Sequence, residues 1–152
     1  MKNETVRFAG MDDIALLTGT RIRQLDDEEE HPDVDIRSAV SDWFAENLGS
    51  GKLHQVIIEE DGRLIATGGL IALPIPPSFF KPQGRNGYIL NMYTIPEKRH
   101  RGYASRVLHL LQEKAKEEGF EVIYLRTSEW GRPAYEKAGF QACGDWMDWT
   151  VR

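Results

Sequence analysis

The sequence predicts a single-domain α/β fold in which a mixed sheet is flanked by helices. In the first half, Asp61-Gly62 separates two apolar runs, which predicts an antiparallel hairpin with a tight turn. In the second half, a strand, an amphipathic helix and another strand follow one another, which predicts parallel neighbours joined by a right-handed crossover. A length of 152 residues with 41% hydrophobic and 28% charged residues suits one compact domain.

The first half is expected to contain a short strand, two helices and the hairpin. The first helix begins after Asp12 and is expected to end before the acidic run of residues 26–30. In the second, amphipathic helix, apolar residues recur every three or four positions until Gly49. These elements are expected at residues 6–8 (strand), 14–25 (helix), 36–48 (helix), 56–58 and 64–66 (hairpin strands).

The second half begins with a proline-rich loop, since residues 74–77 contain three prolines and cannot form a central strand or a helix. Pro96 ends the next strand, and Gly119 ends a long amphipathic helix. Residues 140–143 and 146–151 are expected to form a closing hairpin. The other elements are expected at residues 88–95 (strand), from about 103 (long helix), 122–125 (strand) and 133–139 (short helix).

Composition disfavours several classes of function. A formal net charge of -5 argues against a nucleic-acid partner, and no apolar run is long enough to span a membrane. The single cysteine, Cys143, cannot form an internal disulfide, and residues 1–8 lack the apolar run of a signal peptide, so a cytoplasmic protein is expected. No metal is expected, because the four histidines lack metal-ligand spacing: His31, His54, His100 and His109.

The most informative segment is Arg99-His100-Arg101-Gly102-Tyr103-Ala104, between a strand and a long helix. A helix N-terminus offers unpaired N–H groups and a partial positive charge, so it stabilises a bound anion such as phosphate. Gly102 permits close approach of the backbone, and two arginines add charge. The segment fits neither the nucleotide P-loop nor the dinucleotide-binding pattern. The alternative interpretation is a turn with a solvated basic patch.

The pattern Arg99-x-x-Gly102-x-Ala104 resembles the Arg/Gln-x-x-Gly-x-Gly/Ala signature of the GNAT family of N-acetyltransferases. A second block, residues 125–140 with Tyr135 and Gly139-Phe140, resembles a downstream motif of that family. The resemblance implies one GNAT domain over residues 1–152, with a mostly antiparallel sheet splayed at the fourth strand and acetyl-CoA as co-substrate. The cofactor-binding residues that it implies are Met92, Tyr93, Thr94, Arg99, His100, Arg101, Gly102, Tyr103, Ala104, Ser105 and Ser128.

The resemblance also implies direct attack of an amine on the thioester. Tyr135 would donate a proton to the leaving thiolate, and a main-chain N–H near Met92 or Tyr93 would polarise the carbonyl. The alternative for Tyr135 is an aromatic ring that packs its helix on the sheet. The general base is unassigned among Asn91, Glu59, Glu60, Glu129 and water. Cys143 is expected to be a small buried residue rather than a nucleophile.

The acceptor is expected to be a small-molecule amine, and the acidic run of residues 26–30 favours a cationic one, although a solvated loop is an equally simple explanation. The apolar loop of residues 73–80 could border the acceptor cleft or contact another subunit in a homodimer. The alternatives are a protein acetyltransferase acting on lysines or N-termini, a non-catalytic CoA-binding regulatory module, and a protein–protein adaptor.

Overall fold

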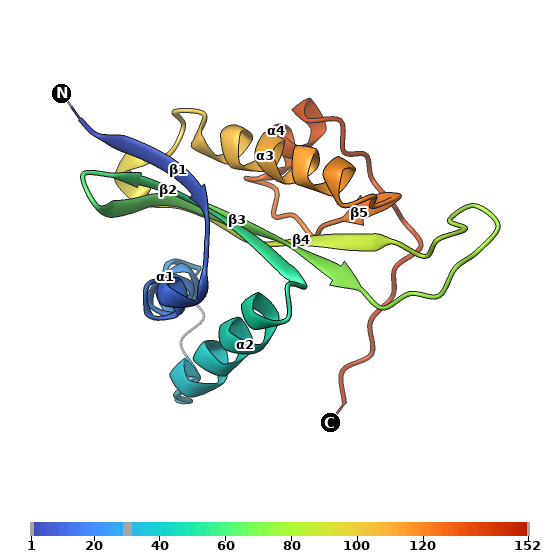
Figure 1. Cartoon of the computed structure of the whole chain (residues 1–152), viewed down its shortest axis with the longest axis horizontal. Coiled ribbons are helices and arrows are strands. Elements are labelled where there is room, and N and C mark those ends of the chain that lie inside the picture. Colours follow the sequence, from blue (N-terminus) through green and yellow to red (C-terminus); the bar gives the residue numbers. More distant parts are fainter. Residues whose placement is uncertain (1, 29–31, 152) are drawn as a thin grey trace.

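A computed structural model of the chain describes residues 2–28 and 32–151. Its centre is a five-stranded sheet in the order β1-β2-β3-β4-β5 (Figure 1). The first three pairings are antiparallel and the last, between β4 and β5, is parallel, which confirms the mixed sheet. The strands are β1 (Glu4–Phe8), β2 (Leu53–Glu60), β3 (Arg63–Leu73), β4 (Asn86–Thr94) and β5 (Val122–Tyr124).

Helices cover both faces of the sheet, with α1 and α2 on one face and α3 and α4 on the other (Figure 1). Two short 3-10 turns precede α1 and α3. The bounds are η1 (Met11–Asp13), α1 (Ile14–Asp27), α2 (Arg37–Gly49), η2 (Pro96–Lys98), α3 (Tyr103–Glu117) and α4 (Arg132–Lys137). In the described part of the chain, no helix has the length and apolar character that crossing a membrane requires.

Most predicted elements are present. Asp61 and Gly62 have φ values of 52° and 81°, as the predicted tight turn between β2 and β3 requires. The prediction that the first helix ends before the acids is wrong, because α1 includes Asp26 and Asp27. The Asp27 carboxylate accepts a hydrogen bond from the Tyr93 hydroxyl at 2.5 Å, and this contact holds the last turn of the helix. Residues 29 and 30 of the acidic run lie outside the described residues.

The predicted closing hairpin is also wrong. Residues 141–151 contain no strand, and no main-chain hydrogen bond joins them to one another or to the sheet. A hairpin is marginal on its own and needs a packed apolar face, whereas every one of these residues is exposed.

The hydrophobic core has two parts, one on each face of the sheet. Val107, Leu111 and Ala115 of α3 pack on one face, and Leu17 of α1 with Phe44 of α2 packs on the other. Gly68 of β3 is the point of closest approach to α3. A Cβ at this position would lie 2.2 Å from the Met92 sulfur and 2.7 Å from Val107 Cγ1, so only glycine allows this packing.

β4 leaves the sheet partway along its length. It pairs with β5 only through residues 86–88, so residues 89–94 have no strand neighbour on that side. The register with β3 shifts between Thr67 and Gly69, where β4 carries a bulge and Asn91 adopts a left-handed conformation with φ 56°. The expected splay of the fourth strand is therefore present.

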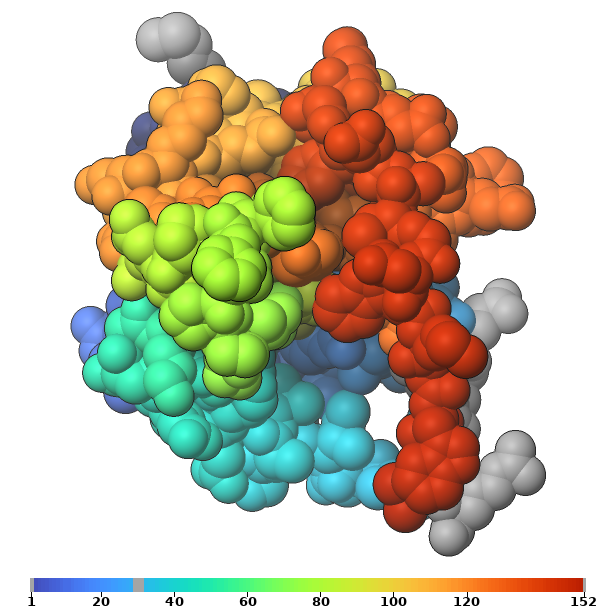
Figure 2. Space-filling model, turned by 90° about the vertical axis from the view of Figure 1, so that its right-hand side faces the viewer, coloured from blue at the N-terminus to red at the C-terminus, as the bar shows by residue number. Residues whose placement is uncertain are grey.

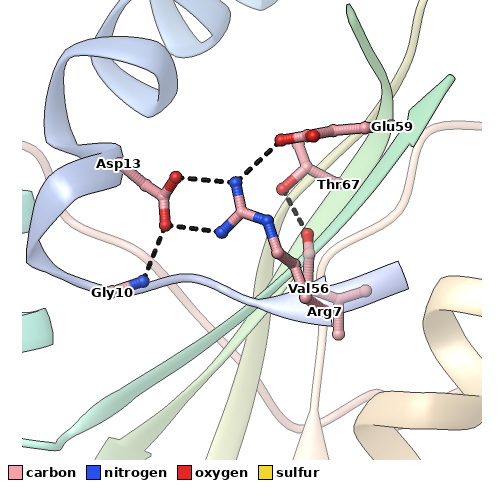
Figure 3. Close-up of polar contacts among 6 residues, drawn as sticks. All are labelled: Arg7, Gly10, Asp13, Val56, Glu59 and Thr67. Carbon is pink, nitrogen blue, oxygen red and sulfur yellow. Dashed lines mark hydrogen bonds and ion pairs between the residues drawn. The ribbon is translucent and has the colours of Figure 1, made fainter. Parts of the chain in front are cut away.

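A partly buried ion-pair cluster fixes the start of α1 to the sheet (Figure 3). Arg7 of β1 binds both carboxylate oxygens of Asp13 at 2.8 Å and Glu59 of β2 at 2.7 Å. The Gly10 N–H also donates to Asp13, at 2.8 Å. The Arg7 hydrogen bonds hold the pKa of Asp13 below its ordinary value, and the two carboxylates raise that of Arg7.

We expect Asp13→Asn to lower the free energy of unfolding by about 1–3 kcal/mol at neutral pH, because a charged hydrogen bond is lost around a partly buried arginine. Because the pKa of Asp13 is lowered in the folded protein, its contribution to stability is present above about pH 4 and is lost as pH falls through the folded pKa. The free energies of unfolding of Asp13→Asn and wild type should therefore become equal in acid. Urea denaturation at several pH values measures this.

The matched control is Glu113→Gln, which breaks an exposed pair with Lys116 and should change stability by less than about 0.5 kcal/mol. Equal stability of Asp13→Asn and wild type at neutral pH would contradict the anchoring function of Asp13.

Candidate active site

The loop that precedes α3 has the backbone expected of an anion site. His100 and Gly102 have φ values of 61° and 85°, and Gly102 is the N-cap of α3 without a side-chain cap. Apart from Gly102 itself and its two chain neighbours, no described residue has an atom within 4 Å of the position that a Gly102 Cβ would occupy. The first amides of α3 therefore border open space, where an anion can accept their hydrogen bonds.

The two arginines that were predicted to bind the cofactor differ in their contacts with the protein. Arg101 is exposed, whereas the Arg99 side chain already contacts the protein. Arg99 Nε donates to the Thr94 carbonyl at 3.0 Å, and its Nη2 lies 3.5 Å from Asp27 Oδ2. Its guanidinium also lies 5.6 Å from the centre of the Tyr93 ring. Arg99 therefore fastens the loop to the end of β4, although its side chain is 43% exposed. His100, Ala104 and Ser105 are exposed, and Tyr103 is half-buried.

The free edge of β4 is held by the end of α1. Gln24 Nε2 donates to the Met92 carbonyl at 3.1 Å, and Asp27 accepts from Tyr93 as described above. Burial and the neighbouring Asp27 raise the pKa of Tyr93 to about 12, so its hydroxyl stays protonated and donates. The sequence analysis missed Gln24 and the contact of Asp27, because both join residues more than 60 positions apart and no local pattern marks them.

Tyr135 lies on α4, half-buried, with its ring edge-on to Phe140 at 6.0 Å between ring centres. Burial raises the pKa of its hydroxyl, and Tyr88 raises it further. Tyr88 is the last residue of β4 that pairs with β5, so Tyr135 lies near the point where the two strands part. Within the described residues, the Tyr135 hydroxyl has no hydrogen-bond partner in the protein, so a ligand can receive its proton.

Ser128 lies in the turn that leads into α4. Its hydroxyl accepts a hydrogen bond from the Gly131 N–H at 3.3 Å, and its carbonyl accepts one from the Arg132 N–H at 3.1 Å. The side chain is exposed and so can also contact a ligand.

The residues considered as the general base differ in whether their side chains are already engaged in ion pairs. Glu59 is paired with Arg7, and Glu60 with Lys98 at 3.0 Å and with Lys2 at 3.2 Å, so both are engaged in ion pairs. Glu129 is exposed in the loop before α4. Asn91 is the polar residue at the bulge, and its Nδ2 atom is buried without a partner in the protein.

Cys143 is exposed, so the expectation of a small buried residue is wrong. The reason is that the C-terminal segment does not join the sheet. Its sulfur donates to Asp145 Oδ1 at 3.0 Å, and this carboxylate raises the pKa of the thiol, which makes it a poor nucleophile.

Across residues 2–28 and 32–151, no group of three or more His, Cys, Asp or Glu residues could hold a metal ion.

Residues 19–140 match the sequence model of the acetyltransferase (GNAT) family. A crystal structure of a predicted acetyltransferase from Clostridium acetobutylicum with acetyl-CoA is 38% identical to the chain, with 97% of this chain and 96% of that one covered and a TM-score of 0.93. A GCN5-related N-acetyltransferase from Ralstonia eutropha JMP134 is 25% identical, with 98% and 99% covered and a TM-score of 0.84. No curated protein matches the chain.

The glucosamine-6-phosphate N-acetyltransferase of Arabidopsis thaliana shares the fold, with 20% identity, 99% of both chains covered and a TM-score of 0.73. The chain belongs to the GNAT family of acetyltransferases. It is an acetyl-CoA-dependent N-acetyltransferase.

We expect Gly102→Ala to weaken acetyl-CoA binding by about tenfold, because a Cβ at a left-handed φ costs roughly 1–2 kcal/mol and shifts the loop toward other conformations. Titration calorimetry measures the dissociation constant. Gly10→Ala is the control, since Gly10 has a φ of -123° and open space around it. An unchanged dissociation constant for Gly102→Ala would show that the loop does not contribute to acetyl-CoA binding.

Proposed function

We propose that the protein transfers an acetyl group from acetyl-CoA to the primary amine of a small, cationic molecule by direct attack. The observation that carries the proposal is the position of Tyr135 beside the point where β4 and β5 part, on the same side of β4 as its unpaired edge. Acetyl-CoA supplies the acetyl group as an activated thioester. The proposed reaction needs no covalent enzyme intermediate.

The loop and the start of α3 are the proposed diphosphate site. Main-chain N–H groups of residues 102–105 and the exposed Arg101 side chain supply hydrogen bonds and positive charge. Arg99 acts indirectly in this proposal, because its contacts with Thr94 and Asp27 fix the shape of the loop. Ser128 is proposed to contact the ligand from the opposite side of the splay.

β4 is proposed to bind the pantetheine arm through its main chain. Residues 89–94 lack a strand partner on one side, so the main-chain groups that point to that side can pair with an amide-containing ligand, apart from the Met92 and Thr94 carbonyls, which accept from Gln24 and Arg99. The side chains of Met92 and Tyr93 are packed inward against the core, which leaves the backbone of Met92, Tyr93 and Thr94 to make these contacts. One of these N–H groups is proposed to polarise the thioester carbonyl.

Tyr135 is the proposed general acid. A hydroxyl whose pKa is raised by burial keeps its proton at neutral pH, and it can pass this proton to a thiolate as the thiol leaves. For the base, the buried and unpartnered Nδ2 of Asn91 supports a bound water at the bulge that receives the amine proton.

The acceptor amine is proposed to enter between the loop before β4 and the C-terminal segment, where Figure 2 shows a hollow in the surface. Asp26 and Glu28, at the end of α1, supply negative charge near the edge of β4. A cationic amine is attracted by such a field, and this favours a small basic acceptor over a neutral one. The alternative acceptors are a protein lysine or N-terminus, and the non-catalytic alternative is a regulatory module that only binds acetyl-CoA.

The extent of the domain and the cellular location stay predictions. The family match over residues 19–140 supports a single N-acetyltransferase domain over residues 1–152. The lone cysteine is consistent with the cytoplasmic location predicted from the sequence.

Tyr135→Phe tests the general acid, because phenylalanine keeps the packing against Phe140 and removes only the proton donor. We expect kcat to fall by roughly 100- to 10,000-fold, with an unchanged dissociation constant for acetyl-CoA. Steady-state kinetics and calorimetry measure the two quantities. Turnover within twofold of wild type would assign Tyr135 to packing alone.

A panel of polyamines, aminoglycosides, neutral amines and lysine peptides tests the acceptor class. We expect the double variant Asp26→Asn/Glu28→Gln to raise KM for a polycationic acceptor several-fold with little change in kcat, because only the attraction of the free amine is weakened. Glu117→Gln, a neutralised carboxylate on α3, serves as control. Acetylation of lysine peptides but of no small amine would favour the protein acetyltransferase, and acetyl-CoA binding without any turnover would favour the regulatory module.

A further inference from the structure

A second hollow in the protein lies between α1, the turn that joins β2 to β3, and η2. Its volume is about 620 Å³, which is in the range of small-molecule sites. It is lined by one face of α1 between Ala15 and Arg23, by residues 62–64 and by residues 95–97. None of these residues is among those proposed to bind acetyl-CoA or the acceptor, so this hollow, the α1 pocket, is a separate site.

Gly19 keeps the α1 side of the pocket open. A glycine inside a helix is destabilising relative to alanine, so its presence needs a reason. Packing does not supply one, because apart from the neighbouring main chain of α1 no described residue has an atom within 4 Å of the position of a Gly19 Cβ. The backbone does not supply one either, since Gly19 is not among the glycines with a positive φ. The space in front of Gly19 is the pocket itself.

The charged side chains of the pocket favour an anionic ligand. Arg63 Nη2 lies 2.6 Å from Glu97 Oε1, so these two charges compensate each other. The Arg23 side chain is exposed and has no ion-pair or hydrogen-bond partner among the described residues. The pKa of Glu97 is lowered by its own main chain, by Arg63 and also by the charge of Arg23, so Arg23 lies near the same carboxylate. The lining thus keeps one uncompensated positive charge, in a chain whose formal net charge is -5.

The other walls of the pocket are largely apolar. Leu16 of α1, which is 38% exposed, lines it together with Leu64 of β3 and Pro96 of η2. An apolar wall beside one uncompensated guanidinium suits a molecule with an apolar body and one carboxylate, because arginine binds a carboxylate through two parallel hydrogen bonds. A neutral apolar molecule would leave Arg23 unpaired, and a wholly polar one would leave the apolar wall uncovered.

The pocket shares a wall with the loop before α3. The Pro96 carbonyl accepts a hydrogen bond from the Arg99 N–H at 3.3 Å. Arg99 in turn contacts Asp27 at the end of α1, one turn beyond Arg23. A ligand that contacts both Arg23 and Pro96 therefore bridges the two elements that Arg99 joins, and it favours the arrangement in which the loop is held.

We propose that the α1 pocket is an effector site for a small amphiphilic carboxylate, which pairs with Arg23 and raises the affinity of the loop before α3 for acetyl-CoA. The effect on acetyl-CoA rests on the proposed diphosphate site, whereas binding in the pocket does not. Because the coupling is reciprocal, acetyl-CoA raises the affinity for the carboxylate by the same factor.

Phenylbutyrate is the probe, because it combines one carboxylate with an apolar body, and phenylbutyramide is its uncharged counterpart. Titration of the isotope-labelled, full-length protein, followed by NMR, should shift the amides of residues 15–23, 62–64 and 95–97 with a dissociation constant of roughly 1 mM. The amide should bind about tenfold more weakly, because it forms no charged pair with Arg23.

Two variants test the pocket itself. Arg23→Gln should weaken phenylbutyrate binding about tenfold, to the level of the amide. Gly19→Leu fills the pocket and should abolish saturable shifts without lowering the melting temperature, because leucine is a better helix former than glycine. Arg37→Gln, which removes an exposed charge from α2, should bind like the wild type. No saturable binding to the wild type, equal binding of acid and amide, or shifts that persist in Gly19→Leu would overturn the proposal.

Calorimetry measures the coupling. Saturating phenylbutyrate should lower the dissociation constant of the wild type for acetyl-CoA about fivefold and leave that of Gly19→Leu unchanged. An unchanged value in the wild type would overturn the effector function when Gly102→Ala weakens acetyl-CoA binding as expected. If Gly102→Ala binds acetyl-CoA like the wild type, the proposed diphosphate site has failed, and the NMR titrations still decide whether the pocket binds the carboxylate.

Discussion

β4 pairs with β5 through only three residues, so one edge of β4 is open over residues 89–94. The proposed cofactor site is built around this open edge. An unpaired strand edge buried in a protein is costly, because each N–H and C=O group loses its hydrogen bonds to water. The bulge at Asn91 lies in the part of β4 that has no pairing with β5. Tyr135 of α4 lies near Tyr88, the last residue of β4 that pairs with β5.

Helix α1 is fixed to the sheet at both ends, and the two attachments differ in kind. At its start, Arg7 and Asp13 form a paired, partly buried ion cluster that couples the helix to β1 and β2. At its end, Gln24 and Asp27 bind the Met92 carbonyl and the Tyr93 hydroxyl on β4. The first attachment joins the helix to β1 and β2, whereas the second holds in place the strand that is proposed to bind the cofactor.

The parts of the fold that follow from local patterns were predictable from the sequence. Amphipathic periodicity indicated α3, and Asp61-Gly62 indicated the turn between β2 and β3. The loop at Gly102 was found because a glycine between a strand and a helix permits a left-handed backbone that other residues rarely adopt.

Features that depend on distant contacts could not be predicted from the sequence. Asn91 is a residue type that tolerates a left-handed conformation, and a strand distortion there was one of the interpretations of the sequence, which the structure confirms. The hydrogen bonds of Gln24 and Asp27 exist only once α1 lies on β4. The end of α1 was misplaced for the same reason, since Asp27 is helical because of Tyr93. The C-terminal segment was misread because its alternating pattern is typical of a strand, whereas a strand also needs a neighbour and a packed face, which a local pattern does not report.

Arg99 contacts Thr94 on β4 and Asp27 on α1 at once, and so it joins the loop before α3 to the end of the first helix. If the loop binds the cofactor and the acidic end of α1 attracts the acceptor, as proposed, Arg99 is the side chain that couples the two sites. Because such linkage is reciprocal, the acceptor would then alter the affinity of the loop by the same factor as the occupied loop alters the affinity for the acceptor.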